Sequence, residues 1–333
     1  MDARHVAGGL VSCRVFALAT AAALVVGAPV RVAAAQTAGQ AASEGTLRDS
    51  VAKAVPDSAG GDVETPSTAD DPLFGRSGKL RARLLDGSGK GVLAFPFLSN
   101  LLKGKIGQPG IHRVNTDKGG RPLTFISLLP FSEKKGASIG AYRLGFWPAE
   151  RGRLRAVAYR NPDGFIEVTS ENQNTPVSEH FRLRDFLTKD QFSTWPKYLV
   201  LREELIDKLE LVIAELQREG IPVRRMTVMS GFRTPQYNQR GVGRGGRAQD
   251  SRHQYGDAAD VFVDNDGDGW MDDLNRDGRV DHRDAQLILA AAERVERRHP
   301  DLAGGVGVYR ATRAHGPFAH VDVRGHRARW GSL

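Results

Sequence analysis

The sequence predicts an α+β fold for the C-terminal half of the chain, preceded by a small β-rich module. Three observations lead to this prediction: strand-length apolar runs broken by Gly and Pro, two amphipathic helical repeats that follow them, and alternating strand patterns around those repeats. The chain has 333 residues, of which 40% are hydrophobic, enough for about two domains with a buried core. We expect the β-rich module to span 76–175 and the α+β domain to span 176–333.

Residues 1–35 are typical of a secretory signal peptide. Two arginines precede an apolar run from Val15 to Ala28, and a small-residue stretch then ends at Ala35. The apolar run is short, so we expect no stable membrane span after cleavage; an uncleaved anchor is the alternative. Cleavage would also remove Cys13, the only cysteine, which suits an oxidising compartment such as the periplasm or the exterior.

Residues 36–75 are rich in Ala, Ser, Thr, Gly, Asp and Pro and have few large apolar side chains. Such a stretch buries too little surface to offset its ordering entropy, so it is predicted to be a disordered linker.

The β-rich module is predicted from apolar runs bounded by turn residues, at 91–96, 123–129, 141–147 and 164–169. No chemical constellation is visible in these runs, and a structural role is the default interpretation.

In the C-terminal domain, a helix is expected over Tyr198–Glu219, because apolar residues recur there every three or four positions. Gly220 follows and is expected to end the helix. A second amphipathic helix is expected over Arg283–Arg298. Strands are expected at 222–229, 257–263, 305–310 and 318–324. Two helices against an antiparallel sheet give an α+β domain.

Composition narrows the function classes. One cysteine excludes a disulfide-stapled scaffold and a Cys-based zinc finger. A formal net charge of +8 indicates a polyanionic partner, but only 7% of residues are aromatic, which argues against a base-stacking nucleic-acid surface. The Gly- and Arg-rich stretch 240–247 lacks the Lys-Ser/Thr of a phosphate-binding loop, so we expect a basic loop beside the cleft and no nucleic-acid partner.

Two short segments carry candidate metal ligands. In the first, His253 and Asp260 flank Gly256, which permits a sharp turn into the following strand. In the second, His320 and Asp322 alternate along a strand and therefore point to one face. Two imidazoles and one carboxylate leave a fourth position open, as catalytic zinc requires. Zinc in such a site acidifies a bound water and polarises a substrate carbonyl.

Residues 251–260, SRHQYGDAAD, match the Ser-x-His-x-x-Gly-x-Ala-x-Asp signature of the zinc D-alanyl-D-alanine carboxypeptidases and murein endopeptidases, which the chain therefore resembles. The closing HVD at 320–322 looks like the third-ligand strand of the subgroup with periplasmic murein endopeptidases. The stretch 229–238, MSGFRTPQYN, is similar to the family's Ser-Gly-Tyr-Arg-Ser-Pro-x-x-Asn segment, and HFRLRDF at 180–186 resembles the opening of that domain. The likeness covers roughly 176–333.

The resemblance implies a hedgehog/DD-peptidase fold and a zinc ion held by His253, Asp260 and His320. It also implies that Arg233 and Ser251 hold a carboxylate of the peptidoglycan stem peptide, a task that suits a guanidinium fork. The implied activity is that of a secreted zinc metallopeptidase, a carboxypeptidase or endopeptidase that hydrolyses stem peptides or cross-links of bacterial peptidoglycan. The periplasm or cell envelope is the implied location.

One position departs from the family pattern. Many relatives carry a Glu or Asp three residues before the last ligand as the general base, and this chain has Pro317 there. Asp322 and His315 are the catalytic candidates that stay open, although Asp322 is equally suited to orient a ligand imidazole. Pro317 favours one alternative, a catalytically silent peptidoglycan-binding protein on the same fold. Two further alternatives are a calcium-dependent structural envelope protein and an amidase outside wall metabolism.

An acidic segment at 264–284 has the spacing of calcium loops, with oxygen ligands at alternate positions and Gly at the sixth. The two twelve-residue windows overlap at 273–275, so they do not form independent EF-hands, and a dockerin-like or thrombospondin-like arrangement is the better comparison. A solvated acidic loop is the alternative. The predicted calcium ligands are Asp264, Asp266, Asp268, Asp272, Asp273, Asn275, Asp277, Asp281 and Asp284.

Overall fold

The computed structural model describes residues 75–85, 108–114, 123–243 and 246–332. The predicted signal peptide, the predicted linker up to residue 74 and the predicted strand at 91–96 lie outside these residues. The described chain combines helices with several small sheets, so the predicted α+β class is confirmed. None of the helices in these ranges is both long enough and apolar enough to cross a membrane.

A five-stranded sheet with the strand order β13-β11-β12-β10-β9 forms the centre of the C-terminal part. Its strands are β9 (Met226–Ser230), β10 (Ala258–Val263), β11 (Gly305–Tyr309), β12 (Phe318–Asp322) and β13 (Ala328–Gly331). Neighbouring strands are antiparallel, except that β13 runs parallel to β11 at the edge. The predicted strands at 257–263, 305–310 and 318–324 are confirmed to within two residues, the one predicted from residue 222 begins four residues later, and β13 was not predicted.

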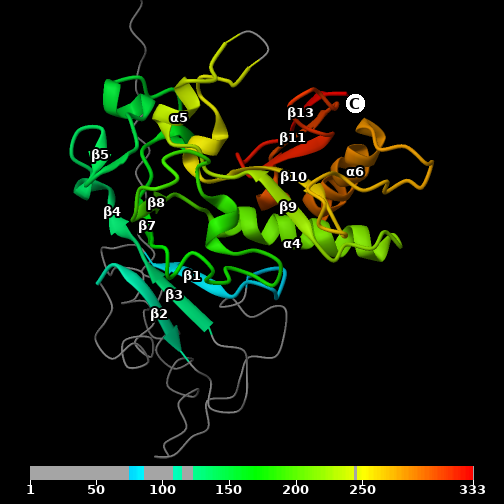
Figure 1. Cartoon of the computed structure of the whole chain (residues 1–333), viewed down its shortest axis with the longest axis horizontal. Helices are drawn as coiled ribbons and strands as arrows, with labels where there is room; N and C mark the ends of the chain where they lie inside the picture. Colours follow the sequence, from blue (N-terminus) through cyan, green and yellow to red (C-terminus); the bar gives the residue numbers. More distant parts are fainter. Residues whose placement is uncertain (1–74, 86–107, 115–122, 244–245, 333) are drawn as a thin grey trace, which may run out of the picture. The chain divides into compact units, whose positions relative to one another are not determined.

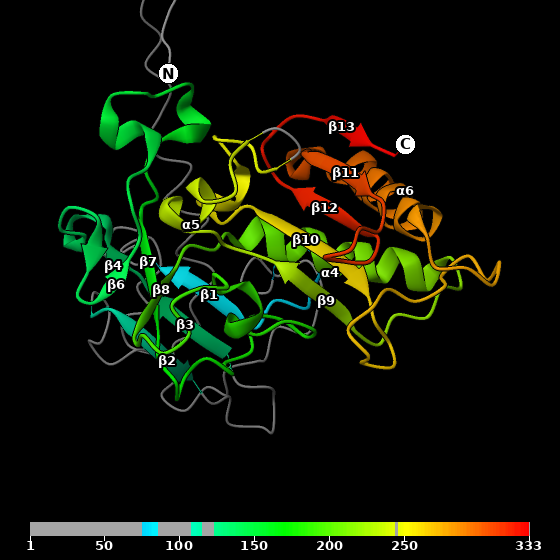
Figure 2. The ribbon, with the colours of Figure 1, turned by 45° about the horizontal axis from the view of Figure 1, so that its top comes forward.

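The two faces of this sheet have different surroundings. Two helices, α4 (Glu203–Arg218) and α6 (His282–Arg298), both lie on one side of it (Figure 1, Figure 2). The small apolar residues of the strands turn to that side and are fully buried, as Val261, Val308 and Val321 show. Because side chains alternate along a strand, Asp260 and His320 project from the opposite face, which these helices leave open.

The helix predicted over Tyr198–Glu219 begins five residues late. Its first residues form β8 (Lys197–Leu199), which pairs with β7 (Gly164–Val168). The apolar residues at 199–201 are buried in this extended segment, so tertiary packing outweighs their helical spacing. Glu203 and Glu204 then open the helix, where acidic side chains are favourable. The second predicted helix is confirmed and starts one residue early, after the N-cap Asp281.

The remaining elements are short. The strands are β1 (Ala82–Leu85), β2 (Gly110–Val114), β3 (Leu123–Ser127), β4 (Leu129–Pro130), β5 (Ser138–Ile139) and β6 (Tyr142–Arg143). One short α-helix, α5 (Pro235–Gln239), accompanies the 3-10 turns η1 (Phe131–Glu133), η2 (Pro148–Arg151), η3 (Val157–Tyr159), η4 (Leu183–Phe186), η5 (Arg252–Tyr255) and η6 (Pro300–Leu302). The β7–β8 pair crosses the boundary predicted at 175/176, and one buried apolar cluster holds residues from both sides of it. The two predicted parts therefore share a core.

A buried lysine ties the helices to the strand that carries His320. Lys208 of α4 is fully buried, and its Nζ donates to Glu296 Oε1 of α6 and to the main-chain oxygen of Asp322, each at 2.7 Å. Glu296 also accepts hydrogen bonds from Gly304 N and the Arg329 guanidinium. Removal of Lys208 would break this buried ion pair, leave Glu296 to its arginine partners and take a donor from the Asp322 main chain.

We therefore expect Lys208→Ala to lower the free energy of unfolding by about 3 kcal/mol, because the buried ion pair with Glu296 and the hydrogen bond to the Asp322 main chain are both lost. Urea denaturation measures the change. The exposed Lys135→Ala is the control and should shift stability by less than about 0.5 kcal/mol. Equal midpoints for the two variants would contradict the importance of the buried pair.

Candidate metal centre

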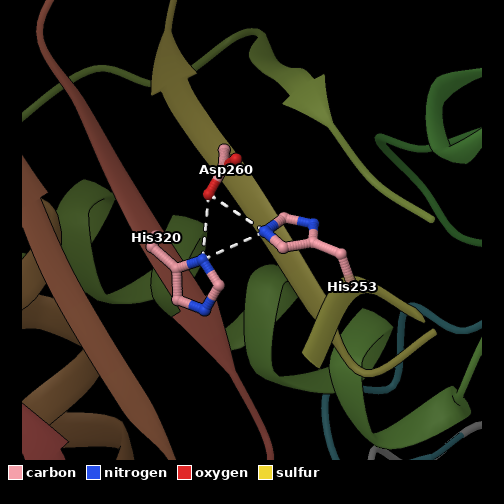
Figure 3. A group of neighbouring side chains, drawn as sticks. All are labelled: His253, Asp260 and His320. Atoms are coloured by element: carbon pink, nitrogen blue, oxygen red, sulfur yellow. Dashed lines mark hydrogen bonds and ion pairs between the residues drawn. The ribbon is translucent and has the colours of Figure 1, made fainter. Parts of the chain in front are cut away.

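Three elements bring His253, Asp260 and His320 together on the open face of the sheet (Figure 3). Asp260 on β10 is directly paired with His320 on β12, and His253 comes from η5, which leads into β10. All three residues are buried, with at most 7% of their surface exposed. His253 Nε2 lies 3.1 Å from His320 Nδ1 and 3.2 Å from Asp260 Oδ1, and His320 Nδ1 lies 2.9 Å from the same carboxylate oxygen.

The turn that delivers His253 depends on Gly256. This residue ends η5 with a φ of +66°, and a Cβ atom there would collide with the carbonyl of Val200. Arg252 fixes the same turn, because its guanidinium pairs with Asp257 and packs against two tyrosine rings that contact each other, 4.8 and 4.9 Å from their centroids. The sharp turn expected at Gly256 is confirmed.

The hydrogen-bond partners behind each imidazole set its tautomer. His253 Nδ1 lies 2.7 Å from the carbonyl oxygen of Gly231, and His320 Nε2 lies 3.1 Å from Asp322 Oδ2. Carbonyl and carboxylate oxygens only accept, so in the neutral imidazoles these two nitrogens carry the protons. The nitrogens that face each other, Nε2 of His253 and Nδ1 of His320, then present lone pairs toward Asp260.

This donor set fits a metal ion. Two zinc–nitrogen bonds of about 2.0 Å at a tetrahedral angle place their nitrogens about 3.3 Å apart, close to the 2.9–3.2 Å spacings observed here. Three buried acceptors at this spacing need a positive charge between them. Two imidazoles and one carboxylate are borderline ligands that suit zinc, and each imidazole has the outer hydrogen bond that metal-bound histidines use.

In the metal-free protein a proton supplies that charge. Burial by itself lowers the pKa of His320, but hydrogen bonds to Asp260 and Asp322 outweigh it and raise the pKa to about 9. Burial lowers the pKa of His253, which keeps this imidazole neutral. Burial alone would raise the pKa of Asp260, yet the two neighbouring imidazoles hold it well below its usual range. The centre is thus a triangle of acceptors that takes up a proton and has the geometry to hold a metal ion.

The two residues predicted to bind substrate are placed differently. Arg233 lies at the centre, because its guanidinium forms an ion pair with Asp260 and its Nε donates to Ser230 Oγ at 2.8 Å. Ser251 is the N-cap residue of η5 and is nearly buried. Among the described contacts, its carbonyl oxygen accepts from Gln254, and no contact links its side chain with the metal ligands.

The structure favours an orienting role for Asp322 over that of a general base. Its carboxylate contacts the Nε2 edge of His320, on the other side of the ring from Nδ1, the nitrogen that faces Asp260. The same carboxylate accepts from Gly305 N at 2.7 Å and pairs with the Arg324 guanidinium. Burial alone would raise the pKa of Asp322, but His320 and Arg324 hold it far below its usual range, so it is a poor proton acceptor.

His315, the other catalytic candidate, lies in the loop before β12. Its ring packs against Phe318 at 5.0 Å, and its Nδ1 lies 2.8 Å from the carbonyl oxygen of Gly316. Within the described part of the chain, no contact joins His315 to the three ligand candidates.

An aromatic wall beside His320 was not predicted. The Trp330 ring lies 5.2 Å from the His320 ring and covers Gly307, where a side chain would collide with the indole. Trp330 Nε1 donates to the Tyr309 hydroxyl at 2.7 Å, and the Tyr309 ring stacks on Phe318 at 4.6 Å. The position of Tyr309 on the ligand face could have been predicted from the alternation of side chains along β11. Trp330 could not, because it lies on β13, which was not predicted.

The acidic segment 264–284 forms two consecutive turns. One oxygen from each of Asp264, Asp266 and Asp268 lies within 4.8 Å of the others, and Asp264 is fully buried at the end of β10. In the second turn, Asp273 accepts from the backbone N–H groups of Asp277 and Gly278. Asn275 Oδ1 also accepts from the backbone N–H of Asp277.

Three other predicted calcium ligands have structural contacts. Asp281 and Asp284 cap the N-terminus of α6, and both carboxylate oxygens of Asp284 accept backbone N–H groups. Asp272 accepts from Asn265 N at 3.0 Å. These three carboxylates therefore stabilise the local fold in the absence of an ion.

Comparison with protein families, curated proteins and solved structures finds no match for this chain.

The stability of the metal-free protein should depend on the protonation of His320. Its pKa in the folded chain, about 9, exceeds the ordinary value of 6.5, so its stabilising contribution is full below about pH 6.5 and is lost as the pH rises through about 9. Urea denaturation of chelator-treated protein at pH 6 and pH 9.5 measures this loss. His320→Gln is the control that lacks the titrating group. A decline of equal size in this variant would show that other groups cause it.

Proposed function

We propose that this chain is a zinc metallopeptidase that hydrolyses peptide bonds in bacterial peptidoglycan, as a carboxypeptidase or endopeptidase with a hedgehog/DD-peptidase fold. The observation that carries the proposal is the convergence of three buried donors, His253, Asp260 and His320, on one point of an open sheet face beside Arg233. The match of residues 251–260 to the family signature supports the reaction class, and the signal-like leader supports a location in the periplasm or outside the cell.

Zinc bound by the three donors would acidify a water molecule and polarise the carbonyl of the scissile bond. The protein's own part is to keep the ligands in position. The Gly231 carbonyl and the Asp322 carboxylate hold the two imidazoles by their outer nitrogens, so the rings present lone pairs without rearrangement. Arg324 and Gly305 in turn hold Asp322.

Arg233 is the residue best placed to bind a substrate carboxylate. Among the described residues its guanidinium forms hydrogen bonds or ion pairs with Asp260 and Ser230 alone, which leaves N–H groups for a further anion. A metal bound to Asp260 would draw on the negative charge of that carboxylate and weaken its ion pair with Arg233. The guanidinium would then bind a second anion more strongly. A guanidinium binds a carboxylate in a fixed fork, which orients the peptide relative to the ligands.

Tyr309 supplies a second substrate contact. Because Trp330 donates to the Tyr309 oxygen, the phenolic proton is free to point elsewhere. Burial raises the pKa of Tyr309, and the charge of Asp260 raises it further, so the hydroxyl stays protonated at neutral pH. We propose that it donates a hydrogen bond to a carbonyl oxygen of the bound peptide.

A second candidate function is peptidoglycan binding without turnover. Two observations favour it: Pro317 occupies the position where the resembling family carries its general base, and Asp322 is engaged by Arg324. Such a protein would hold zinc and the carboxylate of a wall peptide with the same residues.

Digestion of purified sacculi separates the two functions. We expect the zinc-loaded protein to release fragments whose masses name the cleaved bond, and we expect His253→Ala to release none because the ion loses a ligand. The matched control is His326→Ala, at an exposed histidine away from the metal ligands, which should act like the wild type. Zinc-loaded wild-type protein that binds sacculi but releases no fragment would refute the peptidase and support the binding protein.

We also propose that segment 264–284 binds calcium. The acidic loop starts at Asp264, which directly follows β10, the strand that carries Asp260, and Asp264 accepts from Thr227 of β9 and from Gly267 N. A cation there would offset the repulsion between the carboxylates of Asp264, Asp266 and Asp268, and would hold the end of the strand that carries a metal ligand.

Millimolar calcium should therefore raise the melting temperature of the zinc-loaded protein by about 5 °C, because an ion at about 100 times its Kd adds about 2.7 kcal/mol. Differential scanning fluorimetry measures the shift. The double variant Asp268→Asn/Asp277→Asn should lose it, whereas the exposed Glu171→Gln should keep it. A melting temperature that responds to neither calcium nor a calcium chelator would rule out the site.

A further inference from the structure

A cavity of about 350 Å³ lies next to the metal centre on the open face of the sheet. Its walls include Thr227 and Met229 of β9, Phe262 of β10, Trp270 of the acidic segment, and His315 and Pro317 of the loop before β12. We call this cavity the Trp270 groove. Phe262 is two residues beyond Asp260 on the same face of β10, so the groove begins about 7 Å from that ligand.

The groove and Arg233 lie on opposite sides of the metal centre. In the pairing of β9 with β10, Ser230 is opposite Asp260, whereas Thr227 is opposite Phe262. Arg233 follows the Ser230 end of β9, and the groove follows the Thr227 end. A peptide that runs along this direction, with a carboxylate on Arg233 and its scissile bond at the ligands, reaches the Trp270 groove.

Trp270 is positioned as one wall of the groove. Its backbone N–H donates to Asp268 Oδ1 at 2.7 Å, and its ring covers Gly316, where a Cβ atom would be only 3.1 Å from the indole. The residue is nevertheless 56% exposed. A large aromatic ring that is fixed in place but left open to solvent is typical of a binding surface.

Two cationic residues also line the groove. Lys189 is exposed, and Arg225 has an exposed guanidinium 3.7 Å from Asp264. The other walls combine the apolar side chains of Met229, Phe262 and Pro317 with polar groups, among them the carboxylate of Asp264, which Arg225 offsets. An occupant should therefore combine an extended, partly apolar chain with a negative charge at the rim.

We propose that the Trp270 groove binds the part of the peptide substrate that lies across the scissile bond from the Arg233-bound carboxylate, and that this part carries a side-chain carboxylate recognised by Lys189 and Arg225. The inference rests on the proposed function, because the substrate is the peptide cleaved at the metal centre. Trp270 packs against the bound chain and selects for it, although it takes no part in the reaction.

The test uses two synthetic stem peptides that differ only in whether one side-chain carboxylate is free or amidated. Trp270→Ala should lower kcat/KM for both peptides about tenfold, mainly through KM, because it removes an aromatic contact far from the reacting atoms. Lys189→Met should lower kcat/KM about fivefold for the free carboxylate and leave the amidated peptide unchanged. The matched controls are the exposed Phe192→Ala and Lys135→Met, which lie outside the groove and should equal the wild type.

Zinc content and melting temperature of each variant establish that the fold and the metal centre are intact. The variant Trp270→Phe keeps an aromatic ring and should have most of the wild-type activity. Unchanged KM values in an intact Trp270→Ala protein that still cleaves would overturn the groove and leave the peptidase proposal standing. Calorimetric titration of the zinc-loaded protein with the same peptides tests the groove if the protein binds the peptides but does not cleave them. Binding that weakens about tenfold in Trp270→Ala, without cleavage by the wild type, would support the groove and refute the peptidase.

Discussion

Three buried lone pairs that point at one another are the constraint on which this structure depends. His253, Asp260 and His320 sit 2.9–3.2 Å apart, in a place where water does not compensate for repulsion between acceptors. The triangle is stable only with a positive charge inside it. A proton on His320 supplies that charge in the metal-free chain, and the same geometry offers three ligand atoms that could hold a divalent cation.

The rest of the C-terminal fold serves to hold this triangle. The register between β10 and β12 puts Asp260 opposite His320, and the helices are confined to the other face of the sheet. The carboxylate of Asp322 holds one imidazole, and the buried Lys208 holds the main chain of the same residue to α4 and α6. The position of His320 and the stability of the helix layer are therefore linked through β12. The acidic segment extends this arrangement along β10 and contributes Trp270 to the neighbouring groove.

The sequence was most informative where one local pattern determines the structure. The alternation of β10 and β12, the left-handed turn at Gly256 and the spacing of α6 were predictable because each depends on nearby residues. The start of α4 was not, since burial of 199–201 against other elements overrides a helical repeat. Two partners of Asp322, Gly305 and Lys208, were also hidden, because they reach it only through the sheet and the helix layer. The third, Arg324, is only two residues away in the sequence. The wall formed by Tyr309 and Trp330 depends on an edge strand that lacks a clear alternating pattern.

X-ray absorption spectroscopy at the zinc edge, on protein purified without added chelator, is the most direct test of the central claim. The account predicts one zinc per chain, with two imidazole nitrogens and further oxygen ligands at about 2.0–2.1 Å and no sulfur. In Asp260→Asn, zinc should be lost or its oxygen shell altered while both imidazoles keep their outer partners. A wild-type protein that takes up no zinc, or whose zinc spectrum lacks the two-imidazole pattern, would contradict the account.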